Sequence, residues 1–142
     1  MRKITQEAVE AMYSRKKFKK SNTEILVNGD YSAMLLHGNK IAEIDNYELF
    51  ICSKGWHTNT TKERLNGVLA QVFRYYGYIP KIVQKDFEWF IEIYQPSTLT
   101  NETRRIYKDY VFQWNGSKIN VKRWIADEVK RQNNETLQSL FN

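Results

Sequence analysis

Cysteine is almost absent from this chain of 142 residues, which contains Cys52 alone. One cysteine excludes an internal disulfide framework and a zinc site built from several thiolates. Cys52 closes the apolar run that begins at Leu49, so we expect a buried, unreactive thiol. The fold must therefore be stabilised by noncovalent packing.

Long apolar runs are also missing. No segment approaches the roughly 20 residues that cross a bilayer, and the charged N-terminus lacks the apolar stretch of a secretory signal. The six glycines are scattered, so the sequence contains no glycine-rich phosphate loop. We expect a soluble, intracellular protein with no membrane partner and no small-molecule cofactor.

Apolar side chains are nevertheless plentiful, at 42% of the residues, with aromatic side chains at 14%. A chain of this length buries roughly two-thirds of its unfolded surface, which is enough for one stable core. The sequence therefore predicts a single domain.

The net charge of +6 is unevenly distributed. Residues 1–20 hold seven Lys or Arg and two Glu, whereas the other 122 residues have a surplus of one positive charge. Acidic residues then dominate between positions 21 and 52, at Glu24, Asp30, Glu43, Asp45 and Glu48. This distribution predicts a molecule with a basic end and an acidic region.

The first half of the chain predicts a helix followed by an antiparallel meander. Thr5 is the expected N-cap of a helix that runs to about Lys17. Turn residues at 28–29, 38–39 and 45–46 separate four short apolar segments. The expected strands are 22–27, 31–37, 40–44 and 47–53.

A second helix is predicted from Thr61, because Thr60 and Glu63 have the spacing of a capping box. Its core-facing stripe consists of Leu65, Val68, Leu69, Val72, Phe73 and Tyr76, and Gly77 with Pro80 should end it. The N-terminus of a helix attracts anions, so His57, Lys62 and Arg64 beside it are candidate binding residues.

A further hairpin is expected over residues 79–84 and 87–94, and the second helix should pack across the resulting sheet. The polar segment 95–101 marks a boundary between an α+β core at 1–94 and a C-terminal extension at 95–142, packed on or beside the core within one domain. In the extension, a hairpin around Asn115-Gly116 precedes a helix from about Lys122 that frays at Asn133.

The order of these segments resembles small accessory proteins of tailed bacteriophages over about residues 1–94. The likeness rests on Leu36-His37-Gly38-Asn39-Lys40-Ile41-Ala42, on Gly55-Trp56, and on Asn59 to Gly67, and it departs from their pattern after Gln95. It implies a viral accessory protein acting in the cytoplasm of the bacterial host, and supplies no catalytic residues. Small proteins of this kind include anti-CRISPR and other counter-defence inhibitors, so the resemblance implies a host-directed role.

Catalytic chemistry has weak support. His37 and His57 lack further ligands at metal-binding spacing, and no nucleophile motif accompanies His57. Carboxylates at Asp86, Glu88 and Glu92 beside Lys85 are compatible with a metal-dependent nuclease, but a charged solvent face of a sheet explains them better. We therefore predict no catalytic residue and no metal site.

Nucleic-acid contact has the better case, because two sets of basic residues accompany aromatic side chains. The first set is Arg15, Lys16, Lys17, Lys19 and Lys20, and the second includes Arg104, Arg105, Lys108, Lys118, Lys122 and Arg123. If both sets share a face, they form a cationic groove. Tyr107, Tyr110, Trp114 and Trp124 would then stack bases, or would form the core of the extension.

Three functions follow in order of preference. The first is a non-enzymatic inhibitor of a host nucleoprotein or defence complex, which uses a basic, aromatic-rich surface. The second is a general DNA- or RNA-binding accessory protein. The third is a metal-dependent nuclease.

Overall fold

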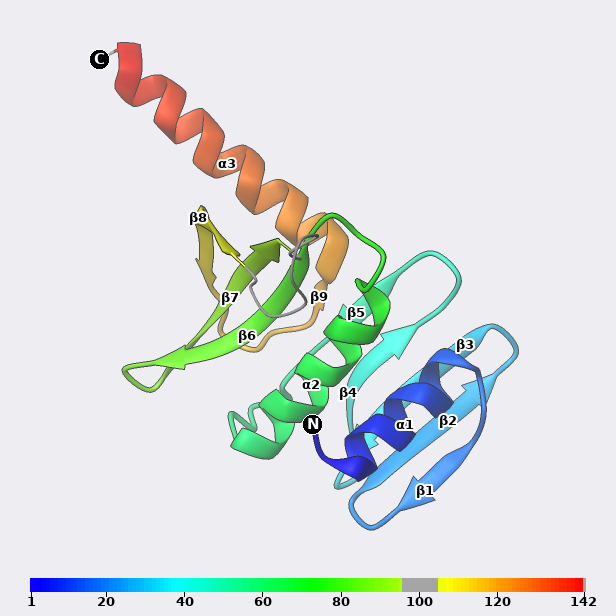
Figure 1. The fold of residues 1–142 in the computed structure, drawn as a ribbon. Coiled ribbons are helices and arrows are strands. Elements are labelled where there is room, and N and C mark those ends of the chain that lie inside the picture. The colour runs from blue at the N-terminus through cyan, green and yellow to red at the C-terminus, as the bar shows by residue number, and fades with distance from the viewer. Residues whose placement is uncertain (96–104, 142) are drawn as a thin grey trace.

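The computed structural model describes the backbone of residues 1–95 and 105–141, and the side chains of residues 1–94 and 110–133. Its helices are α1 (Lys3–Tyr13), α2 (Asn59–Val72) and α3 (Val121–Phe141) (Figure 1). The strands are β1 (Phe18–Lys20), β2 (Thr23–Asn28), β3 (Tyr31–Leu36), β4 (Asn39–Ile44), β5 (Leu49–Ile51), β6 (Ile79–Lys85), β7 (Glu88–Gln95), β8 (Arg105–Gln113) and β9 (Ile119–Asn120). The predicted α+β class is confirmed.

The strands form two antiparallel sheets, one with the order β1-β2-β3-β4-β5-β9 and one with the order β6-β7-β8. The predicted meander and the hairpin of β6 and β7 are both present. The predicted hairpin around Asn115-Gly116 is wrong, because β8 pairs with β7 while β9 pairs with β5. The segment between β8 and β9 therefore carries the chain from one sheet to the other.

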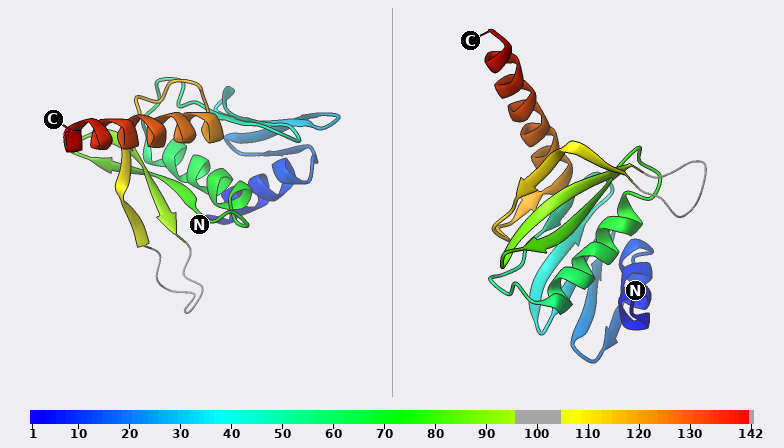
Figure 2. Two further views of the ribbon diagram at one scale, coloured as in Figure 1. Left: turned by 90° about the horizontal axis from the view of Figure 1, so that it is seen from above. Right: turned by 60° about the vertical axis from the view of Figure 1, so that its left-hand side comes forward.

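Tight turns set the register of the meander. Asn28 pairs with Tyr31 across Gly29, and Leu36 pairs with Asn39 across His37 and Gly38, which have φ values of 51° and 80°. Alternate residues, such as Ile25 and Met34, are buried on the face covered by α1 and α2 (Figure 2).

The helix ends differ from the expected ones. Arg2 is the N-cap of α1, and Thr5 lies inside the helix, where it is fully buried. Thr58 caps α2 by accepting a hydrogen bond from the N–H of Thr61 at 3.1 Å, so the capping box of Thr60 and Glu63 is wrong. The reason is that the Glu63 carboxylate accepts from Thr5 of α1 and pairs with Arg64, instead of accepting from the backbone of Thr60. At the other end α2 stops at Val72, before Gly77.

α3 is continuous from Val121 to Phe141, so the predicted fraying at Asn133 is wrong. Its first turns pack on the three-stranded sheet, where Trp124 meets Phe112 edge-on at 5.8 Å. The rest of the helix extends away from both sheets (Figures 1 and 2). Asparagine costs only a few tenths of a kcal/mol relative to the better helix formers, which is too little to interrupt a helix by itself.

The two sheets share one hydrophobic core, to which Leu69, Ile91, Phe112 and Ile119 all contribute. α2 links the sheets directly. The side-chain amide of Asn66 donates to the carbonyl of Ile82 at 2.9 Å, and its oxygen accepts from the N–H of Ile82 at 2.7 Å. One side chain thus satisfies the backbone of β6 at this position.

A buried polar cluster joins α1 and α2 to the larger sheet. Arg64, at 1% exposure, donates from Nε to the hydroxyl of Thr23 at 3.2 Å. Its Nη1 donates to Thr5 at 2.5 Å and to the Glu63 carboxylate at 2.7 Å. Gly67 lies one turn further along α2, and a Cβ there would be 2.7 Å from Thr5 Cγ2, so glycine permits the close approach of the helices.

We expect Arg64→Ala to lower the free energy of unfolding by about 3–5 kcal/mol, because it leaves the part-buried Glu63 carboxylate without its cation. Urea denaturation followed by circular dichroism measures the effect. Lys62→Ala, in the same helix but with no ion pair or hydrogen bond from its side chain to any described residue, is the control and should change stability by less than about 0.5 kcal/mol. A similar small loss for Arg64→Ala would contradict the role assigned to this cluster.

Candidate functional site

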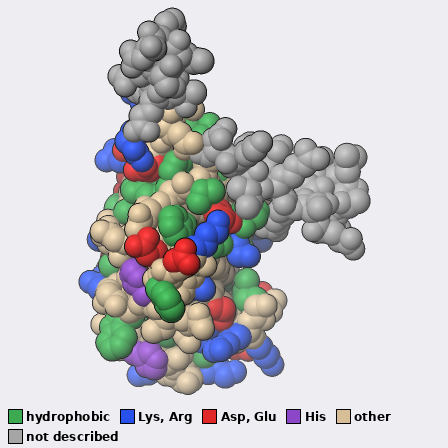
Figure 3. Space-filling model, turned by 90° about the vertical axis from the view of Figure 1, so that its left-hand side faces the viewer, with side chains coloured by type: hydrophobic (Ala, Val, Ile, Leu, Met, Phe, Trp, Pro, Cys, Tyr) green, Lys and Arg blue, Asp and Glu red, His purple; other side chains and the backbone are tan. Residues whose placement is uncertain are grey.

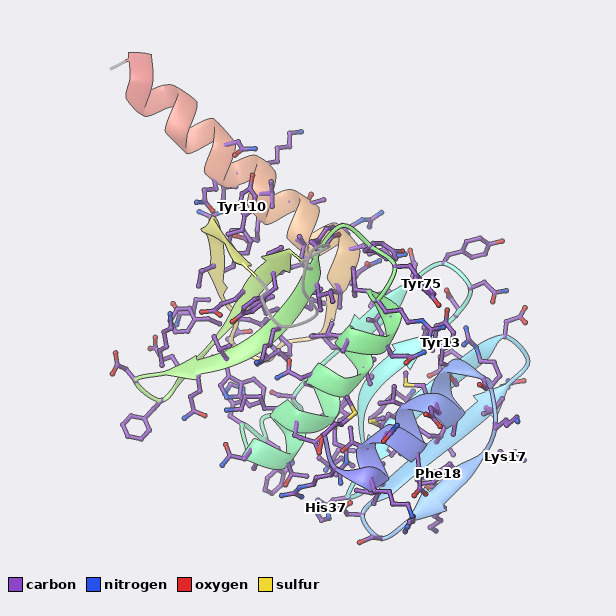
Figure 4. All side chains as sticks on the ribbon, in the orientation of Figure 1. Tyr13, Lys17, Phe18, His37, Tyr75 and Tyr110 are labelled. Carbon is purple, nitrogen blue, oxygen red and sulfur yellow. The ribbon has the colours of Figure 1, made fainter. Side chains whose placement is uncertain are left out.

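Exposed lysines follow the free edge of the larger sheet. Lys19 and Lys20 belong to the edge strand β1, and Lys16 and Lys17 precede it (Figure 4). Lys20 lies 3.8 Å from Glu7, whereas Lys16, Lys17 and Lys19 are exposed and form no ion pair with any residue that the structure describes. Three lysines without ion pairs therefore lie within residues 16–20. We call this segment the lysine edge.

The lysine edge leads to the end of the sheet where both covering helices begin. Lys20 pairs with Thr23, Thr23 pairs with Leu36, and the N–H of His37 donates to the carbonyl of Asn22 at 2.8 Å. Arg64 of α2 donates to Thr23 of β2 and to Thr5 of α1. The N-terminal parts of both helices therefore lie at this end of the sheet. Their partial positive charges add to those of the lysines.

The opposite end of the helices is marked by Tyr13 and Tyr75 (Figure 4). There the guanidinium of Arg74, just after α2, lies 5.3 Å from the ring of Tyr13 at the end of α1. The two helices are therefore parallel, and both N-termini lie at the end of the sheet near His37, which is the lower end in Figure 4. Lys and Arg side chains gather at this lower end on the face that carries both histidines (Figure 3).

A cavity of about 270 Å³ opens at the same end. Leu36 and Ile41 contribute apolar lining, and Trp56 forms another part of it. The polar lining comes from the junction of β3 and β4, from the loop before α2 and from the start of α2. It consists of His37, Asn39, Ser53, Thr58, Thr60 and Thr61. The cavity thus combines an apolar surface with several hydrogen-bonding groups.

Trp56 is exposed to 59% although its backbone is fixed. The two preceding residues, Lys54 and Gly55, both have left-handed φ values, of 55° and 79°. The N–H of Trp56 then donates to the carbonyl of Ser53 at 2.9 Å, and Ser53 is fully buried. The loop therefore presents the indole to solvent on a rigid backbone.

His57 anchors the other side of this loop. Its ring stacks on Trp89, with centroids 4.3 Å apart and planes 12° apart. Nε2 lies 3.1 Å from the carbonyl oxygen of Asn115, so this nitrogen carries the proton and donates. The ring therefore joins loop 52–58 to loop 114–117.

Two of the predicted binding residues have structural roles instead. Arg15 donates to the carbonyls of Asp30 at 2.7 Å and Asp45 at 3.0 Å, and thereby connects α1 to two turns. Arg64 is buried in the cluster described above, so it is unavailable to a surface ligand. Lys62 is half-buried in the first turn of α2 and lies at the basic end.

Lys122 and Arg123 of the second basic set do not join the lysine edge in one groove. The first turn of α3, which contains Lys122 and Arg123, begins directly after β9, and β9 is the opposite edge of the larger sheet from β1. Five strand spacings separate these edges by about 24 Å. Arg104 lies outside the described residues, and the side chains of Arg105 and Lys108 in β8 are not among those described.

The aromatic residues of the extension mainly form core. Trp114 is 2% exposed and its indole N–H donates to the carbonyl of Ser117 at 3.0 Å. Trp124 is half-buried against Phe112, and Tyr110 is half-buried as well. The core interpretation is therefore confirmed for Trp114, while Tyr107 lies among the side chains that are not described.

Two carboxylates of the predicted acidic region, Glu43 and Asp45, have partners within the fold. Glu43 accepts from Tyr31 at 2.6 Å and lies 3.2 Å from Lys40 and 3.0 Å from Lys118. Burial raises the pKa of Glu43, but the hydrogen bonds from Tyr31, Lys118 and Lys40 outweigh it and hold the pKa at about 2. Hydrogen bonds from the N–H groups of Tyr47 and Glu48 lower the pKa of Asp45.

The carboxylates proposed for a nuclease are in unlike surroundings. Glu92 is 4% exposed, so its placement on a solvent face is wrong. It pairs with Lys85 at 3.3 Å and accepts from the hydroxyl of Tyr94. Burial and this hydrogen bond raise the pKa of Tyr94 to about 12. Glu88 instead is exposed and accepts from Gln113 at 3.1 Å.

Sequence reasoning missed Trp56 and the cavity. The available signal was a tryptophan in a polar loop, Lys54-Gly55-Trp56-His57-Thr58, with no apolar residue within two positions on either side. Such a residue has no predicted core position, which is typical of an exposed aromatic side chain. The contribution of His37 and Asn39 could not be predicted, because it depends on how the meander turns back past α2.

The fold and the site define a small α+β protein whose exposed lysines lead to a cavity at one end of a sheet. The family model described as the Kyanoviridae Gp96 protein matches residues 1–128. Since this match covers most of the chain, the protein belongs to that family and is a phage protein. No curated protein and no solved structure matches the chain.

The family match continues beyond Gln95 into α3. The expectation that the likeness to phage proteins ends near residue 94 is therefore wrong. The same description names neither an anti-CRISPR activity nor a ligand.

Within 1–95 and 105–141, no helix has both the length and the apolar character of a membrane span. Among the side chains described, those of residues 1–94 and 110–133, no group of three or more His, Cys, Asp or Glu is arranged to hold a metal ion.

Gly116 tests the packing that supports the cavity loop. Its φ is +86°, and a Cβ there would lie 2.1 Å from Ser53 Oγ and 2.4 Å from His57 Nε2. We expect Gly116→Ala to destabilise the protein by about 3 kcal/mol or more in chemical denaturation, because overpacking adds to backbone strain. Gly38→Ala has a similar φ of +80° but open space, so strain alone should cost about 1–2 kcal/mol. Equal losses would show that the contact with His57 contributes nothing.

The charge network at Glu43 predicts a pH dependence. Because the folded pKa of about 2 lies below the ordinary value of 4.5, the ionised carboxylate stabilises the fold above pH 4.5 and this contribution is lost as the pH falls toward 2. Glu43→Gln should therefore be less stable than the wild type at pH 6, and the difference should disappear near pH 2. Urea titrations across this range measure it; a constant difference would contradict the network.

Proposed function

We propose that this phage protein is a non-enzymatic accessory protein that acts in the host cytoplasm and contacts the nucleic acid of a host nucleoprotein, such as a defence complex. The contact surface consists of the lysine edge and the neighbouring end of the larger sheet, where α1 and α2 begin. This proposal includes inhibition of the bound complex, as an anti-CRISPR protein would achieve it.

The observation that carries the proposal is the exposure of Lys16, Lys17 and Lys19 without ion pairs among the described residues. Some other charged groups, such as Glu43 and Arg64, have partners within the fold, whereas these three lysines lie close together at one edge of the larger sheet. Exposed lysines also discourage other strands from pairing with an edge, but that purpose does not account for the two helix N-termini at the same end. Together these charges suit a polyanion better than a neutral partner.

Contacts of this kind neutralise phosphates and do not read base edges in a duplex. Binding through the lysine edge should therefore be salt-dependent and weakly selective for duplex sequence. Selectivity for one host complex would come from protein contacts beside the nucleic acid, whereas a general DNA- or RNA-binding protein would lack them.

Charge reversal of the lysine edge tests the contact. The triple variant Lys16→Glu, Lys17→Glu and Lys19→Glu should lose at least tenfold in affinity for a labelled nucleic acid at 100 mM salt. The slope of log K against log salt should decrease in magnitude by about 2–3, because each lost phosphate contact removes roughly 0.7–0.9. Fluorescence anisotropy over a salt series gives both quantities.

The matched control reverses three basic residues away from the lysine edge, at Lys81, Arg123 and Lys130, which are exposed. Both triple variants change the net charge equally. If the control loses as much affinity as the lysine-edge variant, net charge alone governs binding and the proposed surface is wrong.

Inhibition of a host complex requires a separate test. The immobilised protein is incubated with host extract, with and without nuclease, and the bound protein and nucleic acid are identified. A defined complex that depends on the lysine edge supports the inhibitor. Recovery of nucleic acid alone, lost on nuclease treatment, indicates a general binding protein.

A further inference from the structure

The cavity beside Trp56 has no role in the fold or in the phosphate contacts described above. We propose that it binds an unpaired nucleobase, so that the preferred ligand of this protein is single-stranded nucleic acid. This inference rests on the proposed function and names its substrate class.

The position of Trp56 is the first argument. Its indole is 59% exposed, yet the backbone before it is fixed by the buried Ser53 and the residue after it is stacked on Trp89. An aromatic ring held rigidly in solvent loses little conformational entropy when a second ring stacks on it. Every base has a flat face, so such stacking accepts any base.

The polar lining is the second argument. His37, Asn39 and Thr60 line the cavity, and their side chains make no hydrogen bond to any residue that the structure describes. They offer an imidazole, an amide and a hydroxyl, which together can both donate and accept. The edge of an unpaired base presents complementary groups, whereas a base within a duplex has already used its pairing edge.

The apolar part of the lining completes the site. Leu36 and Ile41 are 5% and 2% exposed and belong to the core, so they provide a firm surface for a planar ring. The cavity volume of about 270 Å³ lies near the lower end of the range for small-ligand sites. This size suits one ring system rather than a whole nucleotide, whose sugar and phosphate would remain outside.

The path to the lysine edge is the third argument. Lys20 and the cavity residue Leu36 are separated by two strand spacings along the pairs Lys20–Thr23 and Thr23–Leu36, or about 10 Å. One strand can therefore place a base in the cavity and its neighbouring phosphates along β1. The charge of this path favours a nucleic acid over an aromatic side chain of a protein partner.

The test compares three labelled ligands by anisotropy: a 12-nucleotide single-stranded DNA, the same strand with abasic positions at its centre, and a blunt duplex. The wild type should prefer the intact single strand. Trp56→Ala should weaken binding of the intact strand by about 5- to 100-fold and abolish the preference over the abasic strand. Its effect on the duplex and on the salt slope should be small.

Two further variants serve as controls. Trp56→Phe keeps a ring and should retain most of the preference. Tyr47→Ala removes another exposed aromatic residue, 83% exposed in the turn between β4 and β5, and should bind as the wild type does. Because Trp56 is largely exposed, Trp56→Ala should also melt like the wild type.

Each outcome decides between the two proposals. If Trp56→Ala binds the intact strand as tightly as the wild type while the lysine-edge variant does not, the base site is wrong and the phosphate contact stands. Equal losses on the intact and abasic strands also overturn the base site, since they show a loop effect. If the wild type binds none of the three ligands, both proposals fail. Loss confined to the intact strand supports the base site.

Discussion

A buried guanidinium holds the helical layer onto the larger sheet. Arg64 donates to Thr5 of α1 and to Thr23 of β2, and pairs with Glu63 of its own helix. This contact and the glycine at position 67 fix α1 and α2 in parallel, with both N-termini at one end of the sheet. The cavity lies at that end because the first turn of α2 is fixed there. The location of the candidate site thus depends on a polar contact in the core.

The sequence predicted local elements better than their partners. Tight turns of two residues specify a hairpin within a few positions, so the meander of β2 to β5 was predictable from Asn28-Gly29 and its successors. Asn115-Gly116 has the same local chemistry, but Trp114 is drawn into the core beside Trp89, and the two flanking strands join different sheets. The choice of partner depended on distant contacts that no local pattern records. The cap of α2 moved to Thr58 for a similar reason, because Glu63 had a stronger partner in Arg64.

The candidate site likewise has one part that the sequence predicts and another that depends on distant contacts. The exposed lysines were predictable, since a run of like charges can only be solvated or bound. Arg15 and Arg64 looked equivalent to them in the sequence, but each found partners far along the chain. The cavity needed residues from two turns and a loop to be brought together, and the exposure of Trp56 depended on the anchoring of Ser53 and His57. Charge is carried by residue type, whereas a cavity is a property of the assembled fold.

The amide of Asn66 has the same hydrogen-bonding groups as a peptide unit, and it meets Ile82 as a neighbouring strand would. At this point β6 is already paired, although no further strand of the protein lies there among the described residues. A second molecule that tried to extend the small sheet would have to displace this side chain and pull α2 from the core. The side chain of Asn66 therefore protects β6 from pairing with another molecule. A further strand of the protein would otherwise be needed to cover this edge.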